Sequence, residues 1–175
     1  VENNEAGTLE NLTGTFVLNS EDGPREEIGM IPLNLLPSGA ALPLMAYFQP
    51  PLPAQYTASV TVDFVLPVMP DDDRYLDAEI SEQFIEISED GRVADVSGVV
   101  SLPTDGGDAE YVWVNATALD AEGRVVAVRR WEADGEVGSG ESVDFILALY
   151  SLGDSIDWVD VLVEAQRLVA PSDEP

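Results

Sequence analysis

Two short acidic stretches hold the residues of this chain best suited to binding a metal ion. Their aspartates are Asp71, Asp72, Asp73, Asp105 and Asp108. Calcium takes several oxygen ligands from carboxylates, carbonyls and water. Both stretches are therefore candidate calcium sites, although neither has the EF-hand spacing of acidic residues and glycine. The alternative is an acidic linker in the first stretch and a polar hairpin in the second.

The amino-acid composition disfavours nucleophilic catalysis. The 175 residues include no His and no Cys, and all seven basic residues are Arg. Ser–His and Cys–His arrangements therefore cannot be built, and the Ser–Lys variant lacks its lysine. A carboxylate pair could serve a glycosidase, but acids are so abundant that no pair stands out. We expect a protein that is not an enzyme and has no cofactor, with calcium as the one candidate ion.

A second candidate site is a cluster of arginine and tryptophan in an otherwise acidic chain. Arg129 and Arg130 directly precede Trp131. Arginine and aromatic residues are enriched at binding hot spots, so these three residues are a candidate binding surface. The alternative is that the arginines pair with acidic residues across neighbouring strands and need no partner.

The charge of the chain limits its partners. Asp and Glu number 34, and the formal net charge is −27. A field of this sign repels nucleic acid, so we expect no nucleic-acid partner. No apolar run is long enough to cross a bilayer, so we expect no membrane insertion in this segment. An unknown protein or glycan remains as the expected ligand.

Strand patterns dominate the sequence. Residues 56–66 and 110–120 alternate apolar and polar positions with period two, which is typical of a half-buried strand. Turn signals in which glycine follows an acidic residue separate the strands, as at Glu21-Asp22-Gly23 and Glu89-Asp90-Gly91. Further strands are expected at 12–19, 28–35, 41–48, 84–88, 93–102, 125–131, 142–150 and 158–167.

Three pairs of similar segments recur in the same order about a hundred positions apart. Residues 14–23 resemble 114–123, residues 38–48 resemble 139–149, and residues 60–64 resemble 161–165. Repetition of this kind predicts two copies of one β-domain. The first copy lacks counterparts of the two strands that precede the matched part of the second. We therefore expect a sheet edge in the first copy that is covered by residues 74–82, by the second copy or by another chain, as in an edge-strand homo-oligomer.

The second copy resembles a known family. Residues 96–119, the Asp120–Val126 turn and the Gly138–Ser142 turn before Phe145 are similar to the FxLYD-type immunoglobulin-like domain of bacterial and archaeal surface proteins. The signature Phe and Tyr positions of the family are not cleanly present. The resemblance implies an immunoglobulin-like sandwich located outside the cytoplasm, with no catalytic residues.

These observations predict an all-β protein of two tandem immunoglobulin-like β-sandwich domains, the first lacking its N-terminal strands. The expected boundaries are a degenerate or truncated repeat at 1–69, an acidic linker or edge segment at 70–82, a complete repeat at 83–170 and a tail at 171–175. The expected function is that of an extracellular or cell-surface spacer or adhesion and protein-binding module. The alternative is a carbohydrate- or protein-binding accessory domain of a larger extracellular enzyme.

Overall fold

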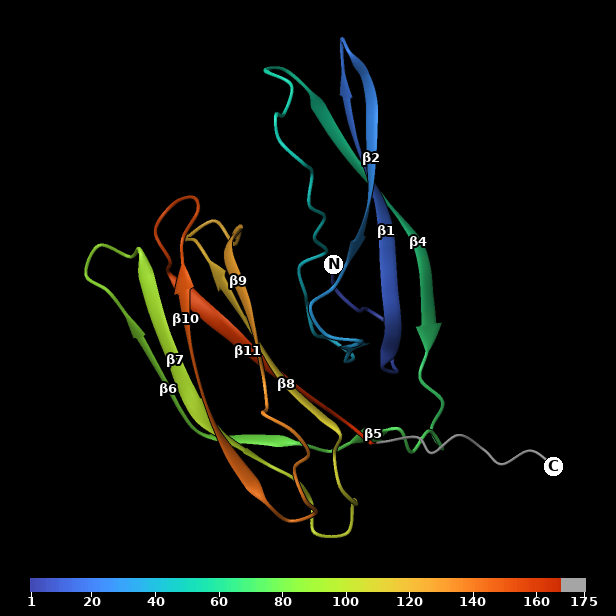
Figure 1. Ribbon diagram of the computed structural model, residues 1–175, viewed down its shortest axis with the longest axis vertical. Coiled ribbons are helices and arrows are strands. Elements are labelled where there is room, and N and C mark those ends of the chain that lie inside the picture. Colours follow the sequence, from blue (N-terminus) through green and yellow to red (C-terminus); the bar gives the residue numbers. More distant parts are fainter. Residues whose placement is uncertain (168–175) are drawn as a thin grey trace, which may run out of the picture. The chain divides into compact units, whose positions relative to one another are not determined.

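A computed structural model describes residues 1–167. The chain divides after Pro70 into two compact units. Unit 1 is residues 1–70, and unit 2 begins at Asp71 (Figure 1). The expected tail at 171–175 and the last three residues of the expected second domain lie outside the described residues. Residues 1–167 form strands and connecting segments without a helix, so the all-β prediction is confirmed.

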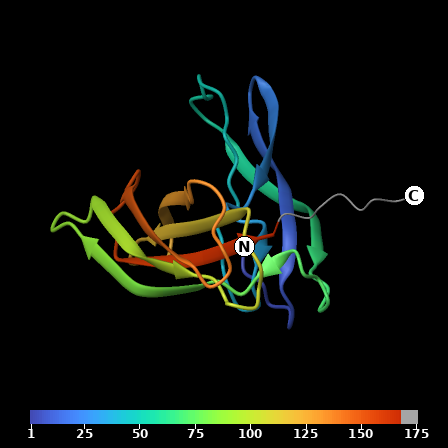
Figure 2. The same cartoon turned by 60° about the horizontal axis from the view of Figure 1, so that its bottom comes forward.

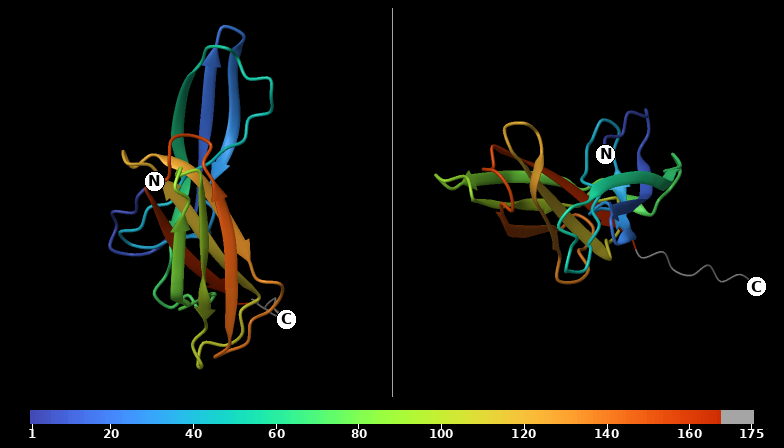
Figure 3. Two further views of the ribbon diagram at one scale, coloured as in Figure 1. Left: turned by 90° about the vertical axis from the view of Figure 1, so that its left-hand side faces the viewer. Right: turned by 90° about the horizontal axis from the view of Figure 1, so that it is seen from above.

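Unit 1 is built on one antiparallel sheet. Its strands are β1 (Leu9–Ser20), β2 (Gly23–Met30), β3 (Leu35–Leu36) and β4 (Thr57–Pro67). β1 is the central strand: β2 and the short β3 pair with one side of it, and β4 pairs with the other. Figure 3 (left) shows β4, β1 and β2 side by side.

The segment between β3 and β4 differs from the sequence prediction. A strand was expected at 41–48, but these residues form only two isolated bridges, from Ala41 to Glu2 and from Met45 to Met30. Pro43 interrupts the segment and cannot donate a ladder hydrogen bond. Residues 31–56 therefore run mainly as irregular chain beside the sheet (Figure 3, left).

The irregular chain of unit 1 packs on the sheet at identifiable points. The guanidinium of Arg25 on β2 donates to the carbonyls of Gln49 and Pro51. Gly14 of β1 leaves room for the Leu44 side chain, because a Cβ there would lie 3.0 Å from Leu44 Cδ2. The buried apolar side chains of unit 1 are Leu12, Leu18, Ile31, Leu33, Leu36 and Leu42.

Unit 2 contains two antiparallel sheets. Its strands are β5 (Tyr75–Leu76), β6 (Glu79–Ile87), β7 (Val93–Ser101), β8 (Tyr111–Leu119), β9 (Val125–Glu132), β10 (Ser142–Tyr150) and β11 (Trp158–Gln166). One sheet has the order β10-β7-β6 and the other the order β5-β11-β8-β9. Figure 2 shows the β6–β7 hairpin in green and β11 in red, on separate layers of the unit.

A continuous apolar core holds the two sheets of unit 2 together. Alternate residues of β8 are fully buried, as period-two alternation requires for a strand with one face in the core. Phe145 of β10 is 2% exposed, and its ring centroid lies 6.1 Å from that of Trp131 on β9. Other fully buried members of the core are Ala94, Val96, Val100, Ala109, Val112, Val114, Ala116, Ala118 and Leu149.

The strand arrangement around residues 70–82 differs from a plain linker. β5 lies in this stretch and pairs with the end of β11, through Leu76 with Ala165 and Tyr75 with Gln166. β6 begins at Glu79, before the expected start at 84, with a register shift between Ser81 and Phe84. Six of the thirteen residues 70–82, those of β5 and the first four of β6, therefore belong to the two sheets of unit 2.

Three strands of unit 1 match three strands of unit 2 in order and register. The sheet β2-β1-β4 corresponds to β9-β8-β11, and every neighbouring pair is antiparallel. The equivalent residue pairs are Gly14–Val62 with Val114–Val163, Phe16–Val60 with Ala116–Val161, and Leu18–Ala58 with Ala118–Val159. The sequence blocks that begin at 14 and 60 thus occupy the same places in both sheets as the blocks that begin at 114 and 161.

The second sheet of unit 2 has no equivalent in unit 1. Residues 1–8, which precede β1, contribute only the isolated bridge of Glu2. The segment equivalent to β10 is the irregular stretch 38–48 described above. A sandwich was expected for residues 1–69, but unit 1 has one sheet covered in part by irregular chain.

Within the described residues, no helix has the length and apolar character needed to span a bilayer.

Candidate functional site

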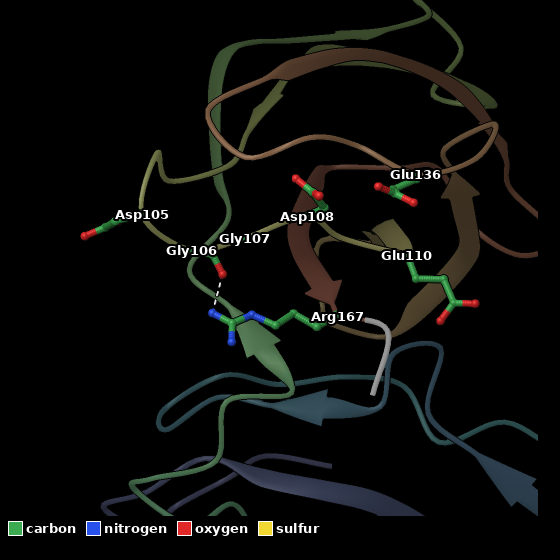
Figure 4. Close-up of a pocket in the computed structure, with 7 residues that line it drawn as sticks. All are labelled: Asp105, Gly106, Gly107, Asp108, Glu110, Glu136 and Arg167. Atoms are coloured by element: carbon green, nitrogen blue, oxygen red, sulfur yellow. Dashed lines mark hydrogen bonds between the residues drawn. The ribbon is translucent and has the colours of Figure 1, made fainter. Parts of the chain in front are cut away.

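An acidic cavity in unit 2 lies beside the Asp105–Asp108 loop, between β7 and β8 (Figure 4). It has a volume of about 450 Å³. Four carboxylates and one guanidinium surround it. The lining residues are Asp105, Gly106, Gly107, Asp108, Glu110, Glu136 and Arg167. The cavity therefore favours positive charge near its mouth.

Arg167 supplies a positive charge to this cavity. Its guanidinium donates a hydrogen bond to the carbonyl of Gly106 (Figure 4). Another nitrogen of the same guanidinium lies 3.4 Å from Asp73 Oδ2. Arg167 thus joins the two acidic stretches that the sequence singled out. Its Nε is buried and has no hydrogen-bond partner among the described residues.

The carboxylates of the Asp105–Asp108 loop point in different directions. Asp105 extends away from the cavity in Figure 4. Asp108 accepts a hydrogen bond of 2.8 Å from the backbone N–H of Ser139, so one of its oxygens already holds the neighbouring turn. The loop turns sharply at Gly107, which has a φ of 87°. The loop connects β7 in one sheet to β8 in the other, so it is a polar connection between the sheets and not the hairpin that was the alternative at this position.

The first acidic stretch is organised around Arg74. The carboxylate of Asp72 accepts hydrogen bonds from the Arg74 backbone N–H and from its guanidinium. The side-chain bond from Arg74 lowers the pKa of Asp72 below its ordinary value, against an opposing effect of burial. Asp71, at the start of this stretch, is exposed.

The structure does not gather the five candidate calcium ligands into one shell. Among residues 1–167, no three acidic side chains form a group that could hold a metal ion. Asp72 and Asp73 instead face Arg74 and Arg167. Calcium binding at either stretch stays a prediction.

The three residues of the candidate binding surface do not share one face. Trp131 is opposite Val114, a core residue, and it packs against Phe145 between the sheets. Arg130 is opposite Asn115, so it lies on the other face of the sheet. Its guanidinium lies 4.5 Å from the ring centroid of Trp113, a cation–π contact. The predicted Arg–Trp cluster is therefore divided by the sheet itself.

Arg129 shares a face of β9 with Trp131 but stays exposed. It lines a smaller cavity of about 190 Å³ with residues of β9, β10 and the following loop. Because β9 is an edge strand, Arg129 remains exposed although it is opposite the core residue Ala116. Adjacent positions on a strand point to opposite faces, which is why three consecutive residues could not form one surface.

Asp120 organises the turn between β8 and β9. Its carboxylate is 2% exposed and accepts hydrogen bonds from the backbone N–H groups of Glu122 and Arg124. It also accepts one from Arg124 Nε, at 2.8 Å. Burial raises the pKa of Asp120, but the hydrogen bonds and charge of Arg124 and the N–H of Glu122 outweigh burial and hold this pKa below its ordinary value.

A pH-dependent loss of stability follows from this turn. A carboxyl group whose pKa is lower in the folded state stabilises the fold above its unfolded pKa, and this contribution disappears as pH falls through the folded pKa. We expect Asp120→Asn to lower the urea midpoint of unit 2 clearly at neutral pH. The deficit relative to the unsubstituted chain should shrink as the pH falls below the ordinary pKa of an aspartate and through the lowered pKa of Asp120. Urea unfolding at a series of pH values measures it.

The matched control for that experiment is Asp154→Asn. Asp154 also binds the Arg124 guanidinium, at 2.6 Å, but its side chain is 69% exposed. Exposed ion pairs contribute little, so this variant should keep the midpoint of the unsubstituted chain. Equal losses in the two variants, or a deficit that does not depend on pH, would contradict the role given to Asp120.

One exposed apolar surface of unit 1, on β4, was not identified from sequence as a site. Every residue of β4 is exposed, including Val60 at 52% and Val62 at 47%. Ala58, Val60 and Val62 share the face of β1 that carries Phe16 and Leu18, because paired residues lie on one face. We call these three residues the β4 stripe. Their equivalents on β11 point into the core of unit 2.

A signal for this surface was present in the sequence. No charged residue occurs between Glu27 and Asp63, in a chain with 34 acidic and seven basic residues. Most of the residues 28–62 are apolar or proline, and this segment ends in β4, whose residues are all exposed. The alternation of residues 56–66 predicted the strand, but alternation alone does not reveal whether its apolar face is covered.

None of the family models, curated proteins or solved structures compared with this chain matches it. The resemblance to FxLYD-type domains therefore remains a prediction.

Proposed function

We propose that this chain is a non-enzymatic, extracytoplasmic module that acts as a spacer or as an adhesion and protein-binding domain. In this proposal it consists of two tandem immunoglobulin-like units, and the first unit keeps only one of the two sheets. The location outside the cytoplasm rests on the sequence resemblance alone.

The topology of unit 2 supports the immunoglobulin-like part of the proposal. In constant-type immunoglobulin domains, the first, second, fourth and fifth strands share a sheet, and the seventh lies beside the sixth. In unit 2, β6, β7 and β10 take the first, second and fifth places. β9 differs, because it pairs with β8 in the opposite sheet. The short β5 takes the place beside β11 that the seventh strand has in those domains.

The matched register of the two units supports a tandem origin. Three strands keep the same order and the same residue pairs in both sheets. A shift of one residue in either sheet would move every side chain of that strand to the other face. Two unrelated sheets would therefore not be expected to pair the same positions of similar sequence blocks.

The chemistry of the cavities supports a non-enzymatic role. The residues around the acidic cavity are carboxylates, glycines and one arginine. Asp108 and Arg167 each make contacts that hold local structure, to Ser139 and Gly106. No Ser, Thr or Tyr hydroxyl lines this cavity beside a basic group that could activate it.

The uncovered strand β4 is the observation on which the protein-binding role depends. A long exposed edge strand with an apolar face is a template for pairing with another chain, and natural proteins usually protect it. Here no described strand pairs with its outer edge. Addition of an extended peptide to such an edge is a common mode of protein recognition.

The carbohydrate-binding alternative has one observation in its favour. Trp158 on β11 is 37% exposed and Tyr111 on the adjacent strand β8 is 39% exposed, but they lie at opposite ends of the strand pair, opposite Leu119 and Gln166. The other two tryptophans already have covered rings, Trp131 by Phe145 and Trp113 by the Arg130 guanidinium. The aromatic surface is therefore smaller than the tryptophan content suggested.

Panning a phage-displayed library of random peptides on the immobilised chain tests the proposal. We expect enrichment of uncharged peptides rich in β-branched residues, because such peptides extend a sheet and match the β4 stripe. The enriched peptides should lose binding to a Val60→Lys/Val62→Lys variant. Ile28→Lys is the control, since Ile28 is 72% exposed on β2 of the same sheet.

Two results would count against the protein-binding proposal. One is failure to enrich any peptide that depends on Val60 and Val62. The other is a specific response of the tryptophan fluorescence to a neutral oligosaccharide, which would favour the accessory carbohydrate-binding domain instead.

A further inference from the structure

We propose that the partner of β4 is β4 of a second copy of this chain, paired antiparallel about a two-fold axis. This inference rests on the protein-binding role given to β4 above and names the occupant of that edge. The paired sheets would form one continuous sheet in the order β2-β1-β4-β4-β1-β2.

The geometry of β4 leaves one complete edge for such pairing. β1 is the only described strand that pairs with β4, along nearly its whole length from Thr57 to Pro67. The pairing is regular from Thr57 to Val62, and a register shift follows where Phe64 is opposite Thr13. The regular part is long enough for a seven-residue ladder when Asp63 is included.

The distribution of charge favours a copy of the same strand over a charged partner. β4 carries a single charge, Asp63, and the hydroxyl of Thr15 already donates to its carboxylate at 2.6 Å. A basic peptide would find no row of carboxylates along this edge to select it. The complementary surface is an uncharged strand with small and β-branched residues, which is the composition of residues 57–62.

A two-fold register centred on Val60 pairs apolar residues on one face of the strand and separates the two Asp63 charges on the other. Val60 would be opposite Val60 of the partner copy, and Ala58 opposite Val62, which joins the two β4 stripes. Asp63 would be opposite Thr57, so the two carboxylates are kept apart. A register centred on Asp63 would instead place like charges opposite each other, which destabilises a strand pair.

The net charge makes this association depend on salt. Each copy carries a formal charge of −27, so two copies repel each other at low ionic strength. The screening length falls from about 10 Å at about 0.1 M salt to about 3 Å at about 1 M. The strand pair holds no ion pair, and its only charges are the two Asp63 carboxylates, each opposite Thr57, so added salt does not weaken it. Dimerisation should therefore strengthen with salt, whereas an ion-paired interface would weaken.

Sedimentation velocity of the whole chain tests the inference. We expect a monomer–dimer equilibrium that shifts towards dimer by at least about tenfold in association constant between about 0.1 M and about 1 M NaCl. Val60→Lys should reduce the association constant by at least about tenfold, because it places two lysines opposite each other on the edge. Ile28→Lys adds the same charge to the same sheet and should leave the equilibrium unchanged.

Hydrogen exchange and a peptide probe separate this inference from the protein-binding role. The amides of residues 57–63 should become more protected as protein concentration rises. A capped peptide of residues 56–67 should bind the chain in competition with dimerisation, and a scrambled peptide should not. A chain that stays monomeric in high salt overturns the self-pairing, even if library peptides still bind β4. A dimer that Val60→Lys leaves intact overturns it as well.

Discussion

Replacing Phe145 with alanine is expected to lower the free energy of unfolding of unit 2 by about 3–5 kcal/mol. The Phe145 side chain is 2% exposed and lies between the two sheets, against Trp131 of the opposite sheet. Its ring also lies over Gly98, where a Cβ would come within 2.9 Å of Phe145 Cε1. The alanine variant would leave a cavity that the paired strands on both sides cannot close, so the loss should lie in the range for buried aromatic residues.

The neighbouring residue provides the control for Phe145. Ile146 is 74% exposed on the outer face of the same strand, so Ile146→Ala should change the free energy of unfolding by less than about 0.5 kcal/mol. Urea unfolding followed by tryptophan fluorescence measures both variants, and the Trp131 environment reports directly on the Phe145 position. Similar losses for the two variants would contradict the placement of Phe145 in the core between the two sheets.

The hairpins were predictable because their chemistry is local. Glycines at 23, 91 and 123 follow acidic residues in the sequence, and each has a positive φ in a turn. The alternation of apolar and polar residues in β8 and β10 was also predictable, because one face of each strand packs in the same core. These features depend on residues a few positions apart, which a sequence displays directly.

The half-repeat of unit 1 could be recognised only in part. The blocks at 14–23 and 60–64 kept their places because β1 and β4 pair through the backbone in the same register as β8 and β11. The block at 38–48 did not become a strand, because Pro43 and the flanking prolines prevent a ladder like that of β10. The side chains of the two blocks are similar, but Pro43 leaves the backbone of 38–48 with one N–H group fewer for a strand ladder.

The candidate sites depended on contacts between distant residues. Arg167 reaches Gly106 and Asp73, which lie 61 and 94 positions away, so the sequence could not show that one arginine joins both acidic stretches. The exposure of β4 depends on a second sheet that unit 1 lacks. A strand pattern predicts an apolar face, but whether another layer covers this face is a tertiary property.

Gly91 provides the second large stability effect, because two constraints meet at one residue. Its φ is 67°, and a Cβ at this position would lie 2.5 Å from Ser155 Cβ. Its carbonyl also accepts a hydrogen bond of 2.8 Å from Ile156 N–H, which ties the β6–β7 turn to the loop before β11. Gly91→Ala should therefore cost about 1–2 kcal/mol for the left-handed backbone and about 1–3 kcal/mol more for the steric contact.

Two further variants separate these two costs. Gly123 has a φ of 77°, and the nearest atom to a Cβ there would be Trp158 Cη2 at 3.9 Å, so Gly123→Ala should show the backbone cost alone. Ser155→Gly in the Gly91→Ala background removes the close Cβ and should recover much of the steric part, while the backbone cost remains. Thermal or urea unfolding of the unsubstituted chain, Gly91→Ala, Ser155→Gly alone and the double variant completes the double-mutant cycle, with Gly123→Ala measured beside it. If Gly91→Ala lowers the free energy of unfolding no more than Gly123→Ala does, the β6–β7 turn and the loop before β11 are farther apart than described here. The steric contact between Gly91 and Ser155 would then not exist.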